Sequence, residues 1–118
     1  MNNKIVVAVA TWVPALMIAL SGVAKLSGAQ AVVEGLTTLG VGPYVPLLGV
    51  MEIVFAALFV WPATMKLGFI LGSCYFAGAI ATELSHGALQ VNPFIPLVLL
   101  WVGAWIRDRS IFLRTAAS

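Results

Sequence analysis

Five polar side chains in this sequence have types and spacing that could support chemistry within an otherwise apolar chain. They are Ser21, Lys25, Glu52, Glu83 and His86. A lysine and a glutamate can form an ion pair or relay a proton, and histidine exchanges protons near neutral pH. Charged groups in apolar surroundings need partners, because burying a single charge is costly. We therefore predict that these residues form a polar pocket.

The elements that carry these residues are apolar segments long enough to cross a membrane. The chain has 118 residues, of which 62% are hydrophobic and 8% are charged. Soluble domains are about 45–50% apolar and about 25% charged, so a water-soluble globular domain is excluded. Disorder is excluded as well, because it requires low hydrophobicity. A bilayer core of about 30 Å requires about 17–25 apolar residues per helix. The predicted spans are 5–24, 44–61, 65–82 and 91–106.

The predicted fold is all-α, a single membrane domain over residues 1–118 with four transmembrane helices in an antiparallel bundle. A short amphipathic helix is predicted over 28–39, between the first two spans. Its apolar residues recur at helical spacing, Ser27 and Gln30 have the spacing of a capping box, and Gly40 is a suitable stop. An irregular loop is the alternative for this segment.

Basic residues predict the orientation. With four spans, five basic residues fall on the side of the two termini and only Lys25 falls on the other side. The five are Lys4, Lys66, Arg107, Arg109 and Arg114. Short cytoplasmic loops are rich in lysine and arginine, so both termini are predicted to be cytoplasmic, in a cell (inner) membrane. We interpret the first span as retained; a cleaved signal peptide is the alternative.

The register of the spans places the polar residues together. Lys25, Glu83 and His86 come at the outer ends of their spans, and Ser21 precedes Lys25 by one turn. Glu52 lies eight residues beyond Tyr44, which is about 12 Å deep at about 1.5 Å per residue. Helical side chains lean toward their own N-terminus, so Lys25 and Glu52 on antiparallel helices lean toward each other. The predicted ion pair either fixes helix register or belongs to a functional pocket.

The sequence gives little support for a metal site, a functional cysteine or a nucleic-acid partner. Glu83 and His86 have the Glu-x-x-His spacing of di-iron proteins, but those sites need a second motif and two further carboxylates, so we predict no metal and no built-in cofactor. Cys74 is the only cysteine and is predicted to be a buried packing residue. The net charge of +2 does not indicate a nucleic-acid partner. Small residues from Gly68 and Gly72 onward predict close helix packing within the monomer, with a homo-oligomer as the alternative.

Several segments together resemble the DoxX-like family of small membrane proteins. Residues 21–26 (SGVAKL) resemble its SGxxKL signature, and residues 39–43 (LGVGP) followed by 49–52 (GVME) resemble its LG loop and GxxE helix. Residues 78–86 resemble the small-residue run that leads to a histidine, although family members often place the histidine sooner after the threonine. The resemblance covers nearly the whole chain.

The resemblance implies four membrane helices and carries over Lys25, Glu52 and His86 as candidate functional positions. Some members of the family are subunits of quinone-linked oxidoreductases, including thiosulfate:quinone oxidoreductase, and eukaryotic relatives assist membrane-protein assembly. The first hypothesis is therefore an accessory subunit of a redox assembly, with a quinone and redox-protein subunits as partners alongside the lipid bilayer. A non-enzymatic scaffold or assembly factor and a small proton-coupled transporter are the alternatives. An autonomous enzyme is not expected.

Overall fold

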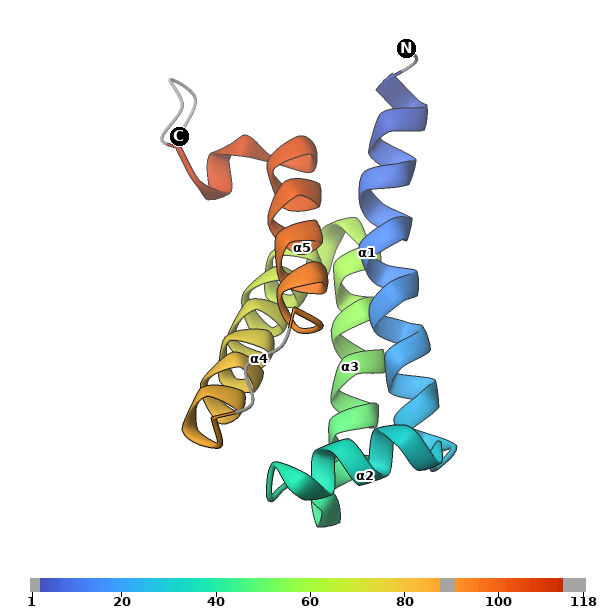
Figure 1. The fold of residues 1–118 in the computed structure, drawn as a ribbon. Helices are drawn as coiled ribbons and strands as arrows, with labels where there is room; N and C mark the ends of the chain where they lie inside the picture. Colours follow the sequence, from blue (N-terminus) through green and yellow to red (C-terminus); the bar gives the residue numbers. More distant parts are fainter. Residues whose placement is uncertain (1–2, 88–90, 114–118) are drawn as a thin grey trace.

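The computed structural model describes residues 3–87 and 91–113, and the regular elements of these residues are helical (Figure 1). The α-helices are α1 (Asn3–Leu26), α2 (Gln30–Thr38), α3 (Val45–Val60), α4 (Met65–Ser85) and α5 (Phe94–Arg107). Three short 3-10 turns, at Gly42–Tyr44, Pro62–Thr64 and Arg109–Ile111, connect or follow them. The predicted all-α class is confirmed, and α1, α3, α4 and α5 coincide with the four predicted segments to within one helical turn.

The four apolar helices pack in a ring. Helix α1 packs against α3 and α5, and α4 also packs against α3 and α5. Successive apolar helices run in opposite directions, so the start of α1 and the end of α5 lie at the same end of the molecule, while α2 crosses the opposite end (Figure 1). The core between the helices includes Ile18, Phe59, Leu100 and Ala104.

Within the part of the chain that the structure describes, three segments are long and apolar enough to cross a membrane: Asn3–Leu26, Gly42–Val60 and Pro62–Ser85. Helix α5 is shorter, with 14 residues and a length of about 21 Å. Many large apolar side chains on the outer surface are exposed, as expected of a surface that faces lipid. The chain is therefore a membrane protein. Residues 88–90, between the third and fourth predicted spans, and Arg114 among the basic residues lie outside the described part of the chain.

The helix predicted over 28–39 is confirmed as α2, but its predicted capping box is wrong. The N-cap residue is Ala29, which makes no side-chain cap. The Ser27 hydroxyl donates to the carbonyl of Ala24 in the last turn of α1, and the Gln30 amide donates to Glu34. Only a short turn separates the two helices, so Ser27 closes the first helix and does not open the second.

The predicted stop at Gly40 is confirmed. Gly40 has a φ of +82°, which favours glycine. Its N–H donates to the carbonyl of Thr37, and the N–H of Val41 donates to the carbonyl of Leu36. These two bonds form a Schellman motif, which satisfies the last carbonyls of α2 and turns the chain toward α3.

The small residues of α4 serve packing inside the monomer, as predicted, at two positions. A Cβ at Gly68 would overlap the backbone of Phe59 in α3, and one at Gly72 would lie 2.8 Å from the Leu100 side chain in α5. Further along α4 the contact opens, because a Cβ at Gly78 would meet no atom within 4 Å. The helices therefore meet closely at one end of α4 and leave space toward the other.

Candidate functional site

Glu52 is the centre of a buried polar cluster. The residue is 1% exposed. Its Oε1 accepts hydrogen bonds from Lys25 Nζ at 2.7 Å, from the Tyr75 hydroxyl at 2.9 Å and from the Ser21 hydroxyl at 3.3 Å. Lys25 Nζ also donates to Ser21 Oγ at 2.9 Å. The predicted Lys25–Glu52 ion pair is thus confirmed, and it joins α1 to α3.

Two glycines allow the helices to approach closely beside this pair. A Cβ at Gly22 would lie 2.7 Å from the carbonyl oxygen of Gly49, and a Cβ at Gly49 would lie 2.8 Å from the carbonyl oxygen of Gly22. Gly22 precedes Lys25 by three residues, and Gly49 precedes Glu52 by three. Residues three apart share a helix face. The close crossing of α1 and α3 therefore positions both charged side chains toward each other.

The bonds to Glu52 are unevenly divided between its two oxygens. All three donors converge on Oε1, whereas Oε2 is buried and has no hydrogen-bond partner among the described residues. The side chain of Lys25 is 11% exposed and that of Glu52 is 2% exposed. An ammonium and two hydroxyl donors at one oxygen compensate a buried carboxylate, because hydrogen bonds to charged groups are the strong ones.

Tyr75 is the member of the cluster that sequence reasoning missed. Its ring packs edge-on against Phe55 at 5.8 Å and Phe76 at 5.0 Å between centroids, while its hydroxyl reaches Glu52. A buried tyrosine hydroxyl needs a hydrogen-bond partner. A tyrosine in the middle of an apolar span could have been paired with the one carboxylate inside another span.

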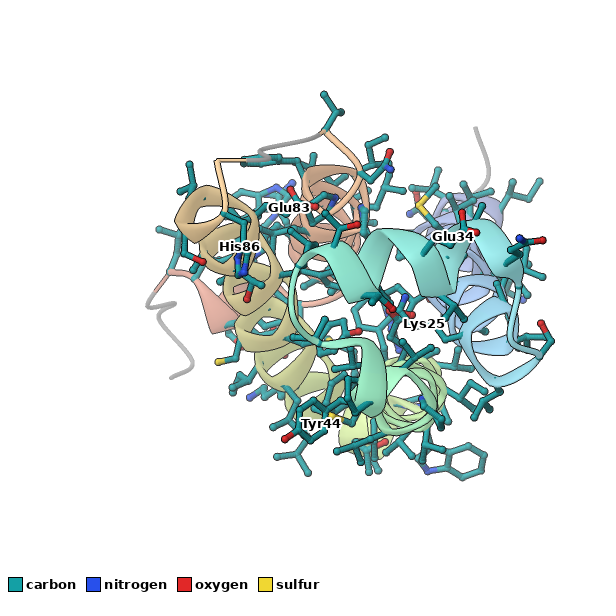
Figure 2. The ribbon with its side chains drawn as sticks, turned by 60° about the horizontal axis from the view of Figure 1, so that its bottom comes forward. Lys25, Glu34, Tyr44, Glu83 and His86 are labelled. Atoms are coloured by element: carbon teal, nitrogen blue, oxygen red, sulfur yellow. The ribbon has the colours of Figure 1, made fainter. Side chains whose placement is uncertain are left out.

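A cavity of about 1040 Å³ adjoins the cluster. Most of its walls are apolar, and they come from α1, α2, α3, α4 and α5 together with the segments that flank them. Ser21, Lys25, Glu52, Tyr75 and Glu83 provide polar groups on its walls. Helix α2 lies across this end of the molecule, beside Lys25 (Figure 2), and its Ala31, Val32 and Leu36 line the cavity. The arrangement suits a ligand with a polar head and an apolar body.

The two remaining predicted site residues, Glu83 and His86, lie in different surroundings. Glu83 is 8% exposed and lines the cavity with Ser21, Lys25 and Glu52. His86 is exposed and does not line it. Its Nδ1 lies 3.0 Å from the Thr82 carbonyl oxygen. Figure 2 shows Glu83 and His86 on the part of the molecule opposite Glu34.

The remaining questions about the site concern Cys74 and the groups that could hold a metal ion. The prediction of a buried Cys74 is wrong: the residue is exposed and lines the cavity, because α4 turns this side away from its packed neighbours. Within residues 3–87 and 91–113, no group of three or more His, Cys, Asp or Glu side chains is placed to hold a metal ion.

Comparison with known proteins identifies a family. The model of the DoxX-like family matches residues 9–106 of the chain, a range that contains the whole cluster around Glu52. No curated protein and no solved structure matches the chain.

Proposed function

The chain belongs to the DoxX-like family, and on that premise we propose that it is an accessory membrane subunit of a quinone-linked redox assembly. In this proposal the cavity holds the head group of a quinone beside Lys25 and Glu52. The observation that carries the proposal is the juxtaposition of a buried charged cluster and a largely apolar cavity of about 1040 Å³. A quinone has a matching division, with a polar ring and an isoprenoid tail.

The proposal assigns distinct roles to the walls of the cavity. Lys25 donates two hydrogen bonds within the cluster, and an ammonium group has three N–H donors, so one remains for a ligand oxygen. Apolar side chains such as Ile18, Leu48 and Phe76 would contact the ring and tail. The volume of about 1040 Å³ is slightly larger than the range of about 300–1,000 Å³ that is usual for small-molecule sites.

We propose that α5 is the fourth membrane crossing and that both termini are cytoplasmic. The Arg107 guanidinium donates to the carbonyls of Phe59 and Val60, so α5 and α3 end at the same level. A short span is accommodated by local thinning of the bilayer. The basic residues Lys4, Lys66, Arg107 and Arg109 gather at the end where α1 starts and α5 ends, which supports a cytoplasmic location by the positive-inside rule. The cavity would then lie in the outer half of the membrane.

Cysteine labelling tests this topology. In a Cys74→Ala background, an Asn3→Cys variant should react with a membrane-impermeant maleimide only after the cells are opened. Labelling of Asn3→Cys in intact cells would place the N-terminus outside and reverse the assignment. A cysteine at Gly28, in the turn after α1, is the matched control and should be labelled from outside.

Purification from the native cell in mild detergent tests the function. The wild-type protein should retain a quinone, identified by mass spectrometry of the extracted lipid, together with subunits of a redox enzyme. Lys25→Met should lose the quinone, whereas Glu34→Gln, on the exposed surface of α2, should keep it. Recovery of a membrane protein client without quinone or redox subunits would overturn the proposal in favour of a scaffold or assembly factor.

A further inference from the structure

We propose that α2 is a gate that closes one end of the cavity, and that the ring of His86 holds the gate shut. The inference rests on the proposed function in one respect, because it takes the cavity as the ligand site. It adds a route by which a ligand enters, and it gives a role to His86, which does not line the cavity.

Helix α2 forms the long side of a flap that crosses one end of the bundle. The flap leaves α1 at Gly28, runs along α2 to the turn at Gly40, and returns through Gly42–Tyr44 to α3. Its base is firmly held, because the crossing of α1 and α3 brings their backbone atoms together. Its tip at Gly40 lies beside His86, which follows the last residue of α4. The flap therefore reaches from α1 and α3 to α4 (Figure 2).

The side of α2 that faces the bundle lies over open space. Ala31, Val32, Gly35 and Leu36 line the cavity. A Cβ on Gly35 would meet no atom of the described residues within 4 Å, and no residue of α2 is buried. A helix of nine residues is not stable in water on its own, so packing against the rest of the molecule must hold it. A segment with so few buried contacts opens more easily than the core helices do.

The side-chain hydrogen bonds of α2 are made within the helix itself. The Gln30 amide donates to the Glu34 carboxylate. The hydroxyls of Thr37 and Thr38 donate to carbonyl oxygens one turn earlier in α2. Because each of these bonds has both partners in α2, a movement of the whole helix breaks none of them. The helix can therefore move as a unit.

The tip of the flap is in contact with His86. A Cβ on Gly40 would lie 3.5 Å from Nε2 of His86 and 4.0 Å from its Cε1. The ring is fixed to α4 on its other side, since Nδ1 lies 3.0 Å from the Thr82 carbonyl oxygen and 3.0 Å from the Ser85 hydroxyl oxygen. A ring that α4 holds in this position supports the flap in its closed form. Loss of the ring should therefore raise the population of the open form and leave the buried ion pair intact.

A bound ligand should favour the closed form. Ala31, Val32 and Leu36 line the cavity from α2, so a ligand in the cavity contacts them only while the gate is shut. A ligand that makes more contacts in one of two conformations shifts the population toward it. Closure of such an element also separates a bound ligand from water.

Distances between spin labels, measured by pulsed electron paramagnetic resonance on the protein in phospholipid nanodiscs, test the gate. In a Cys74→Ala background, labels at Glu34→Cys and Leu84→Cys, two exposed positions, report the distance from α2 to α4. The ligand-free protein should show two distances, the shorter for the closed form and the longer for the open form. A benzoquinone with a ten-carbon tail should raise the share of the shorter distance. Labels at Val23→Cys and Leu84→Cys, which join α1 to α4, are the control and should give one distance.

Removal of the ring tests the role of His86. His86→Ala should raise the ratio of open to closed form about threefold or more, as expected for the loss of a side-chain contact. Tyr44→Ala is the matched control, because it removes another exposed ring at this end of the molecule, away from His86 in Figure 2, and should leave the ratio unchanged.

The outcomes separate the gate from the proposed function. A single distance from α2 to α4, or a ratio that His86→Ala leaves unchanged, would overturn the inference and leave the proposed function in place. Two distances that respond to His86→Ala but not to the quinone would support the gate and count against the quinone as the ligand. If His86→Ala does not fold, the two distances of the wild-type helices still decide whether α2 opens.

Discussion

Removing either charge of the Lys25–Glu52 pair should destabilise the protein, and removing both should cost less than the sum. Lys25→Met leaves a carboxylate that is 2% exposed, with the Tyr75 and Ser21 hydroxyls as its remaining donors. Breaking a buried ion pair in this way typically costs about 3–5 kcal/mol. Because two neutral donors remain, we expect a loss near the lower end, about 3 kcal/mol.

Glu52→Gln should be milder. The ammonium of Lys25 that it leaves is 11% exposed and lies one residue from the end of α1. A lysine at that position can extend its flexible chain toward water. The glutamine also keeps an acceptor for the neighbouring hydroxyls, so we expect a loss of about 1–2 kcal/mol, as for a weakened buried hydrogen bond.

The double variant measures the coupling between the two residues. Lys25→Met together with Glu52→Gln leaves no buried charge at the crossing of α1 and α3. Its loss should therefore be smaller than the two single losses summed by about 1–2 kcal/mol. The assay is reversible unfolding in mixed micelles with a rising fraction of denaturing detergent, followed by circular dichroism. Losses that add to within about 0.5 kcal/mol would refute the pairing. Glu34→Gln, on the exposed face of α2, is the control and should change stability by no more than about 0.5 kcal/mol.

Three further predictions concern other parts of the chain. Tyr75→Phe should lower the free energy of unfolding by about 1 kcal/mol, through loss of its bond to the carboxylate, in the same unfolding assay. Gly22→Ala should cost about 1–3 kcal/mol, because its Cβ would meet backbone atoms of α3, whereas Gly78→Ala, in open space, should be neutral or stabilising. The hydroxyl and the backbone N–H of Ser110 lower the pKa of Asp108 below its usual range. Asp108 should thus stabilise the turn after α5 above its unfolded pKa and lose that effect as pH falls through its folded pKa, and an NMR titration should show a higher pKa in Ser110→Ala.

The apolar helices could be predicted because lipid restricts the choices available to the chain. In a bilayer every backbone polar group must be satisfied within the segment, so a long apolar run becomes a helix whatever its side chains are. The start of α2 depends instead on a few competing local bonds. The Ser27 hydroxyl had a suitable carbonyl at Ala24 in the preceding turn, and spacing to Gln30 alone could not show that this bond would form.

The site was predicted in part, and the predictions that were wrong or missing have a geometric cause. The lengths of the predicted spans give the depth of each residue in the membrane, and depth was sufficient to pair Lys25 with Glu52. Depth does not give the rotation of a helix about its axis, which brings Tyr75 to Glu52 and turns Cys74 to the cavity. The third span was also predicted to end at residue 82, whereas α4 continues to Ser85. His86 is therefore the C-cap residue of α4, where its ring bonds to the preceding turn and does not line the cavity.

The glycines beside the ion pair show that the sequence contains structural information beyond hydropathy. The glutamate side chain is short, so a distance of 2.7 Å between Lys25 Nζ and Glu52 Oε1 is favoured where the two helix backbones nearly touch. Gly22 and Gly49 meet that requirement, since a Cβ on either would overlap the backbone of the other helix. Each glycine lies one turn before the charge that it serves, on the same helix face. A Gly-x-x-Lys motif near the end of one span and a Gly-x-x-Glu motif near the start of the next therefore predict the crossing point and the ion pair together. The charges alone indicate a need for partners, and the glycines indicate where the backbones come close enough to provide them.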